Sequence, residues 1–179
     1  VWMGMTEETA LDIGDNSPGT ALNVASRSIP KHQVRLEEFF CDITEVTNLQ
    51  WQTYLNQTGQ KPSKLLVELV WKNDDTYGDG EEMLPIRNVT LYEAREFSRW
   101  CGKKIPTEAE WLRAAAGDDG RIFPWGNEYD RNLCTNKRNR LLPVGSYEGG
   151  KSPFDILDMS GSVYEWTETR LVEFPKFKL

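Results

Sequence analysis

The sequence predicts a small α+β domain with long irregular loops, and three observations lead to this fold class. Three segments have the pattern of capped amphipathic helices that end at a glycine. Short runs of alternating apolar residues, typical of β-strands, lie before, between and after these segments. The chain also has 7 Trp, 7 Phe and 6 Tyr, whose large apolar surfaces can hold irregular loops on a core.

Each predicted helix begins with a capping box, in which a threonine is followed three residues later by Gln or Glu. The pairs are Thr47 with Gln50, Thr90 with Glu93, and Thr107 with Glu110. Glycine lacks a Cβ atom and readily takes the left-handed conformation that ends a helix. We therefore expect helices that end at Gly59, Gly102 and Gly117. The acids of the third helix, Glu108 and Glu110, are interpreted as capping residues rather than as a catalytic acid and base.

The predicted strands are shorter and their pattern is weaker. They cover residues 33–39, 66–71 and 141–146. The chain has 179 residues, which is enough for one domain with a sizeable core, so a single domain over 1–179 is expected. Trp111, Trp125 and Trp166 are expected to be part of that core.

The charge of the chain argues against a nucleic-acid partner, and its hydropathy argues against a transmembrane helix. The chain has 21 basic and 28 acidic residues, a net charge of -7, and no basic block that could follow a phosphate backbone, so a nucleic-acid partner is not expected. No run of eighteen apolar residues is present, and a transmembrane helix is therefore not expected either. The N-terminus lacks the features of a signal peptide, but it also begins without Met and has the look of a cropped product.

The three cysteines are widely spaced, at Cys41, Cys101 and Cys134, without a CxxC pair, which argues against a zinc ribbon. Two interpretations remain: three small buried thiols, which is favoured, or one disulfide with one free thiol. His32 is the only histidine, so a site that needs two imidazoles is excluded.

The stretch DMSGSVYEW, residues 158–166, has oxygen-bearing side chains spaced around Gly161. Judged from the residues alone, it is either a turn in which Asp158 bonds its own backbone or a loop that binds a hard cation. Carboxylates near both ends of the loop, at Asp158 and Glu165, suit either interpretation.

Five stretches of the chain, taken together, resemble the formylglycine-generating enzyme (sulfatase-modifying factor) family, in that family's own order. They are FFCDITEVTNLQWQTYLNQTG, LPIRNVTLYEAREFSRWCGKKIPTEAEWLRAAAG, FPWGN, PVGS and DMSGSVYEWT. The likeness runs from residue 1 to Thr167 and covers about the first two thirds of the family's domain, so the domain is expected to be incomplete at its C-terminal side. The resemblance implies a C-type-lectin-like fold, with a small twisted antiparallel sheet, flanking helices and long irregular loops.

The resemblance does not imply one activity. The family includes an oxidase that uses copper and oxygen to convert a sulfatase cysteine to formylglycine, parts of iron enzymes, accessory proteins and binding modules. In the oxidases two cysteines that follow the VYEWT segment hold copper(I), and none of the three cysteines here has a matching position. No catalytic and no cofactor-binding residue can therefore be carried over, copper is not supported, and catalysis by this chain is not expected.

The resemblance does imply a structural calcium ion in the DMSGSVYEW loop. The ligands would be the Asp158 side chain, the backbone carbonyls of Gly161 and Val163, and the Glu165 carboxylate. Calcium prefers such oxygen ligands. A second calcium site of the family would need an aspartate between Cys134 and Phe154, and the sequence has none there.

These observations lead to the hypothesis of a non-catalytic family member that serves as a structural or partner-binding subunit of a larger protein complex. Two alternatives remain: a fragment of a copper- and oxygen-dependent formylglycine-generating oxidase, and a calcium-dependent lectin-like module that binds a ligand. By the family's habit, a periplasmic or secreted location is expected.

Overall fold

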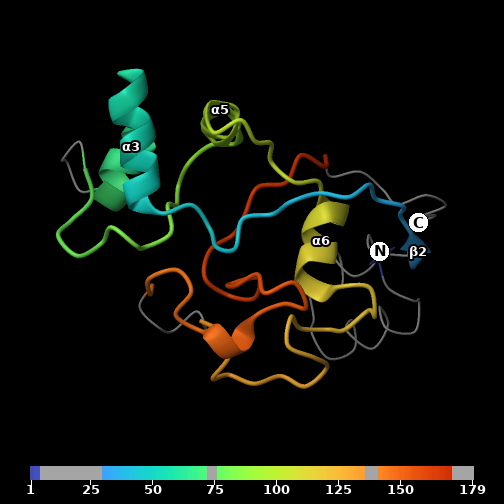
Figure 1. Ribbon diagram of the computed structural model, residues 1–179. Helices are drawn as coiled ribbons and strands as arrows, with labels where there is room; N and C mark the ends of the chain where they lie inside the picture. Colours follow the sequence, from blue (N-terminus) through green and yellow to red (C-terminus); the bar gives the residue numbers. More distant parts are fainter. Residues whose placement is uncertain (5–29, 72–75, 136–140, 171–179) are drawn as a thin grey trace.

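Helices and loops make up most of the computed structural model, which describes residues 1–4, 30–71, 76–135 and 141–170 (Figure 1). Its strands are β1 (Trp2–Met3) and β2 (His32–Gln33). Its helices are α3 (Asn48–Thr58), α4 (Lys64–Leu66), a π-helical turn η1 (Val67–Trp71), α5 (Leu91–Trp100), α6 (Glu108–Ala116) and a 3-10 turn η2 (Glu148–Gly150).

The three predicted helices are confirmed as α3, α5 and α6, each with its capping box. In α3 the Gln50 backbone N–H donates to Thr47 Oγ1 at 3.2 Å, and the Thr47 N–H donates to Gln50 Oε1 at 2.9 Å. Both bonds satisfy N–H groups that the first turn of a helix leaves unpaired. Gly59 ends α3 in the left-handed region, with φ of 67°, where a side chain is disfavoured.

The predicted strands are largely wrong. β1 and β2 form an antiparallel pair of two residues each, with Trp2 opposite Gln33. Val34 also exchanges backbone hydrogen bonds with Val1, and the chain from 35 to 39 has no strand partner among the described residues. Residues 66–71 form the end of α4 and η1, because Leu66, Val70 and Trp71 bury one face at a helical spacing. Residues 141–146 form coil and a turn. In the described part of the chain, the expected antiparallel sheet is thus reduced to the β1–β2 pair.

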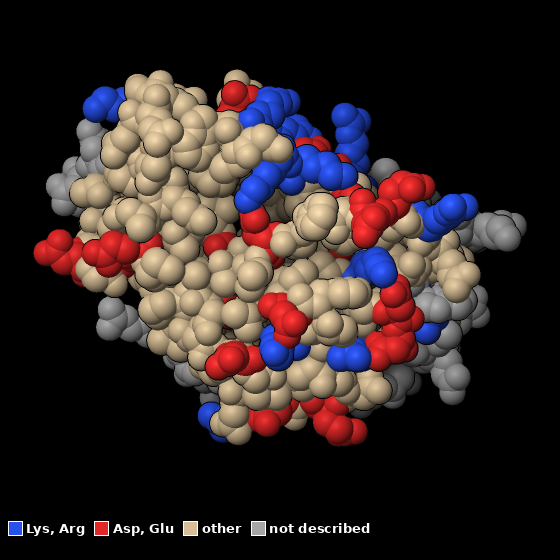
Figure 2. Space-filling model, viewed as in Figure 1, with Lys and Arg blue, Asp and Glu red and all other residues tan. Residues whose placement is uncertain are grey.

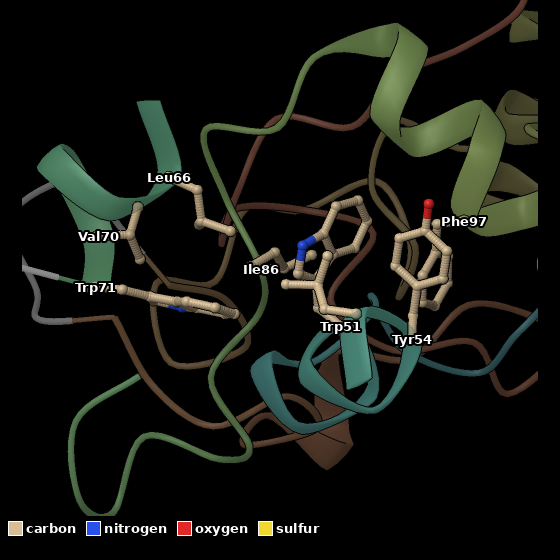
Figure 3. Packing of buried hydrophobic residues seen from close by; sticks show 8 residues of the cluster. Trp51, Tyr54, Leu66, Val70, Trp71, Ile86 and Phe97 are labelled. Atoms are coloured by element: carbon tan, nitrogen blue, oxygen red, sulfur yellow. The ribbon is translucent and has the colours of Figure 1, made fainter. Parts of the chain in front are cut away.

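The main hydrophobic core lies between α3, α5 and the α4–η1 segment (Figure 3). Trp51 and Tyr54 of α3 face Phe97 of α5, and the Trp51 and Phe97 rings stack with their centroids 5.1 Å apart. On the other side of Trp51, Trp71 is 2% exposed, and its Nε1–H donates to the side-chain oxygen of buried Asn48 at 3.3 Å. The aromatic side chains therefore hold α3, α5 and the α4–η1 segment together.

A smaller cluster connects α6 to the C-terminal part of the described chain. It contains Ala114, Ala115, Ile156 and Met159, with Trp111 packed against it. The expectation that three tryptophans join the core holds in part. Trp111 and Trp125 are half-buried, but Trp166 is 49% exposed.

No helix within the described ranges has the length and apolar character needed to cross a membrane. On the face shown in Figure 2, basic side chains gather mainly in the upper middle part, and acidic side chains are dispersed around them. This face shows no continuous basic stripe of the kind that follows a nucleic-acid backbone.

Candidate metal site

The backbone of the candidate loop, residues 158–165, has positive φ angles at three residues. Asp158 has a φ of 59°, Gly161 of 94° and Ser162 of 52°. Of the described non-glycine residues with positive φ, all but Asn88 lie within 155–162. A non-glycine residue in this region costs about 1–2 kcal/mol, and surrounding contacts must compensate for that cost.

The Asp158 carboxylate joins the loop to a distant part of the chain. Its Oδ2 accepts a hydrogen bond of 2.5 Å from the backbone N–H of Gly145. The turn interpretation predicted a bond to the neighbouring backbone instead, and this contact between residues thirteen positions apart does not fit it.

Gly161 is required at its position by a close approach of two backbones. A Cβ atom on Gly161 would lie 2.3 Å from the carbonyl oxygen of Thr135, well inside van der Waals contact. The missing side chain therefore allows the Thr135 carbonyl to lie directly against the loop.

The Glu165 carboxylate lies at the other end of the loop and contacts α6. Its Oε2 accepts a hydrogen bond of 2.8 Å from Trp111 Nε1. Although Glu165 is exposed as a whole residue, desolvation of its carboxylate raises the pKa. The Trp111 bond opposes this shift, and the negative charge of Asp158 adds to it.

A third carboxylate, Glu45, was not predicted from the sequence. Both of its carboxylate oxygens are buried, and neither has a hydrogen-bond partner in the described structure. Desolvation is the main cause that raises the pKa of Glu45 to about 7, and the negative charges of Asp158 and Glu165 raise this pKa further. The nearby Ser162 side chain lowers the pKa of Glu45 somewhat, although it forms no hydrogen bond of normal geometry with the carboxylate. No sequence motif connects Glu45 with the loop, because the contact arises when the chain entering α3 packs on residues 158–165.

These residues fit a hard divalent cation. A buried carboxylate without partners is costly, and the negative charges that raise the pKa values of Glu45 and Glu165 favour a positive charge nearby. Across the described residues, no three His, Cys, Asp or Glu side chains converge closely enough to hold an ion by themselves. A cation here would therefore need backbone carbonyls as ligands, as the expected set of Asp158, Gly161, Val163 and Glu165 provides. The calcium site remains a prediction.

The cysteines do not form a disulfide with one another. All three are free, and the expectation of three buried thiols holds for Cys134 alone, since Cys41 is exposed and Cys101 is half-buried. The hydrogen bond from Lys103 to Asp42 is the main cause that raises the pKa of the Lys103 ammonium group. Cys41 and Cys101 both lie near this ammonium group and add to the rise. Desolvation raises the pKa of both thiols, so that less of each is present as the thiolate at neutral pH and a metal would have to displace the proton.

The chain is similar to known proteins over most of its length. The model of the sulfatase-modifying factor enzyme 1-like domain matches residues 5–176. The chain belongs to this family. Hercynine oxygenase of Mycolicibacterium smegmatis is 30% identical over 175 residues, which cover 83% of this chain and 41% of that protein.

Two further relatives of the chain are a protein kinase and an enzyme named as inactive. The serine/threonine-protein kinase pkn1 of Chlamydia caviae is 35% identical over 149 residues, which cover 78% of this chain and 24% of the kinase. The inactive C-alpha-formylglycine-generating enzyme 2 of Bos taurus is 35% identical over 100 residues, which cover 48% of this chain and 33% of that protein. The chain thus spans less than half the length of these curated relatives.

Proposed function

We propose that this sulfatase-modifying factor domain is non-catalytic and serves as a structural or partner-binding part of a larger protein complex. The state of the thiols is the observation that carries the proposal. Copper(I) needs thiolate ligands, whereas Cys134 is buried and the pKa values of Cys41 and Cys101 are raised.

The relatives support the same proposal. One relative is described as inactive, and in the kinase the matched stretch is 24% of the protein. Domains of this family therefore accompany other domains and also occur in a protein described as inactive. The lectin-like fold that the resemblance implies is part of this proposal, although its sheet is limited to the β1–β2 pair in the described part of the chain.

A copper(I) titration tests the lack of a thiolate site. The reduced chain competes with bicinchoninate for copper(I), alongside Cys41→Ser and Cys101→Ser variants. We expect the wild type and both variants to take up equally little copper. Stoichiometric tight binding by the wild type that either substitution abolishes would contradict the proposal.

The same result would favour the second candidate function, a part of a copper- and oxygen-dependent oxidase. One observation supports this alternative: Cys41 and Cys101 both lie near Lys103, although they are 60 positions apart in the sequence. A positive charge stabilises thiolates, and for Cys101 it opposes the rise in pKa that desolvation causes.

We also propose that calcium binds the 158–165 loop and stabilises it. The ligands would be the Asp158 and Glu165 carboxylates with the carbonyls of Gly161 and Val163, and the ion would offset the charge of buried Glu45. Calcium would neutralise the negative charge of these carboxylates and would keep the 158–165 loop in contact with Gly145 and α6.

Thermal denaturation with and without calcium tests this site. Asp158→Asn and Glu165→Gln should each reduce the rise in melting temperature that calcium causes, because each removes a charged ligand. Asp155→Asn is the matched control, since Asp155 also has positive φ in the same region but forms an exposed ion pair with Lys151. If calcium stabilises wild type and variants equally, or stabilises none, the loop does not bind it.

A further inference from the structure

Residues 166–169, which directly follow the candidate metal loop, form a strap that joins the N-terminal ends of α5 and α6. Trp166 Nε1–H donates to the Val89 carbonyl at 2.9 Å, and Glu168 N–H donates to the Pro106 carbonyl at 2.9 Å. Val89 and Pro106 each directly precede the N-cap threonine of their helix. In Figure 1 the red end of the described chain lies beside the connection between α5 and α6.

Two side-chain contacts add to the backbone contacts of the strap. The Glu168 carboxylate accepts two hydrogen bonds from the Arg95 guanidinium group of α5, from Nε at 2.8 Å and from a terminal nitrogen at 2.6 Å. Such a bidentate pair fixes the orientation of both side chains as well as their distance. Thr169 Oγ1 accepts a bond of 2.9 Å from the Glu108 N–H, which the first turn of α6 leaves without a partner inside the helix.

The strap is held by polar contacts rather than by burial in a core. None of its four residues is buried, and Trp166 is 49% exposed. The Arg95 and Glu168 side chains are 40% and 34% exposed, so water competes for the groups that pair. A segment with few buried apolar contacts opens locally at a much lower free-energy cost than the whole domain. The strap can therefore leave α5 and α6 while the rest of the chain stays folded.

The strap begins next to Glu165, which is one of the proposed calcium ligands. Glu165 Oε2 accepts a bond of 2.8 Å from Trp111 Nε1, so this side chain already lies against α6. A cation that binds Glu165 together with Asp158 would fix the position of the chain where the strap starts. Ordering a free segment costs conformational entropy, and a strap whose first neighbour is already held loses less of it on docking.

We infer that calcium binding to the 158–165 loop and docking of residues 166–169 on α5 and α6 are coupled, so that the strap is a calcium-dependent switch. With calcium the strap stays docked. Without calcium it opens more often and uncovers the N-terminal ends of α5 and α6. The coupling is reciprocal, so a substitution that releases the strap also weakens calcium binding. This inference rests on the proposed calcium site and adds the part of the molecule that the site controls.

Hydrogen exchange measured by NMR, with calcium and with chelator, reports the docking of the strap. The Glu168 amide and the Trp166 indole N–H are the probes, because both donate to carbonyls across the strap contact. Arg95→Ala removes the bidentate pair. Arg99→Ala is the matched control, since Arg99 lies on the same helix and pairs with Glu96 instead of the strap. Isothermal titration calorimetry gives the calcium affinity of each protein.

We expect calcium to slow the exchange of both probes in the wild type by about tenfold, within the usual range of coupling between two sites. In Arg95→Ala both probes should exchange faster than in the wild type. Calcium should also bind Arg95→Ala more weakly than Arg99→Ala, by no more than the factor by which it slows exchange. Arg99→Ala should match the wild type in both measurements.

Two results would overturn the coupling alone. In the first, calcium raises the melting temperature of the wild type but leaves the exchange of both probes unchanged. In the second, Arg95→Ala and Arg99→Ala have the same exchange rates and the same calcium affinity. If calcium changes neither the melting temperature nor the exchange of the wild type, the calcium site itself is wrong and the inference falls with it. The non-catalytic proposal is tested separately, by the copper(I) titration.

Discussion

Replacement of the buried carboxylate, Glu45→Gln, gives the most informative perturbation of the candidate site. The carboxylate oxygens of Glu45 are buried without partners, and its pKa is raised from 4.5 to about 7. The folded state therefore keeps this proton at pH values at which the unfolded state has released it. The stability that comes from the protonated form is fully present below pH 4.5 and is lost as the pH rises to about 7.

The size of this loss follows from the shift in pKa. One pKa unit corresponds to about 1.4 kcal/mol, so the free energy of unfolding should fall by at most about 3 kcal/mol between about pH 4 and pH 8. Glutamine cannot ionise, so Glu45→Gln removes this loss, although its buried amide costs about 1 kcal/mol. In chelator the variant should be about 2 kcal/mol more stable than the wild type near pH 8, and should have no advantage near pH 5.

Urea denaturation followed by tryptophan fluorescence, at both pH values, measures these differences. In calcium the advantage of the variant near pH 8 should shrink, because a cation near the ionised carboxylate stabilises the wild type. Glu37→Gln, which replaces an exposed glutamate, is the matched control and is measured at the same two pH values. If the difference between Glu45→Gln and the wild type is the same near pH 5 and pH 8, the burial of an ionisable carboxylate at this position is refuted.

Three further substitutions test the fold by the same urea assay. Gly161→Ala should cost at least about 2 kcal/mol more than Gly59→Ala, because both positions have positive φ but a Cβ atom would clash at Gly161 alone; equal costs would contradict the close approach. Thr107→Ala should cost about 1 kcal/mol through the lost cap of α6, and a neutral result would show that the cap is unimportant. Asn48→Ala should cost about 2–3 kcal/mol because it leaves the Trp71 indole N–H unpaired in the core, and a change below about 1 kcal/mol would argue against that bond.

The helices could be predicted from the sequence because their signals are local. A threonine cap, an acid or amide three residues later and a closing glycine all lie within one short segment, as in α6 from Thr107 to Gly117. The family could be recognised for a related reason, because stretches such as IPTEAEW combine these local signals in a fixed order.

The strands and part of the candidate site could not be predicted in the same way. The short apolar run 66–71 suits a strand or a helix, and packing of Leu66 and Trp71 against α3 decides between them. Glu45 reaches the 158–165 loop through tertiary contacts that leave no trace in the local sequence. The loop itself was found because Asp158 and Glu165 lie close together in the chain, but its curvature depends on the distant Thr135 and Gly145.

An oxidation assay tests the central claim most directly. The purified chain is loaded with copper(I) and incubated with oxygen, a reductant and a sulfatase-type peptide that contains cysteine, and mass spectrometry measures conversion of the cysteine to formylglycine. Because Cys134 is buried and the pKa values of Cys41 and Cys101 are raised, we expect the peptide to remain unchanged. Catalytic conversion that depends on Cys41 or Cys101 would contradict the claim that this domain has its family's frame without its oxidase chemistry.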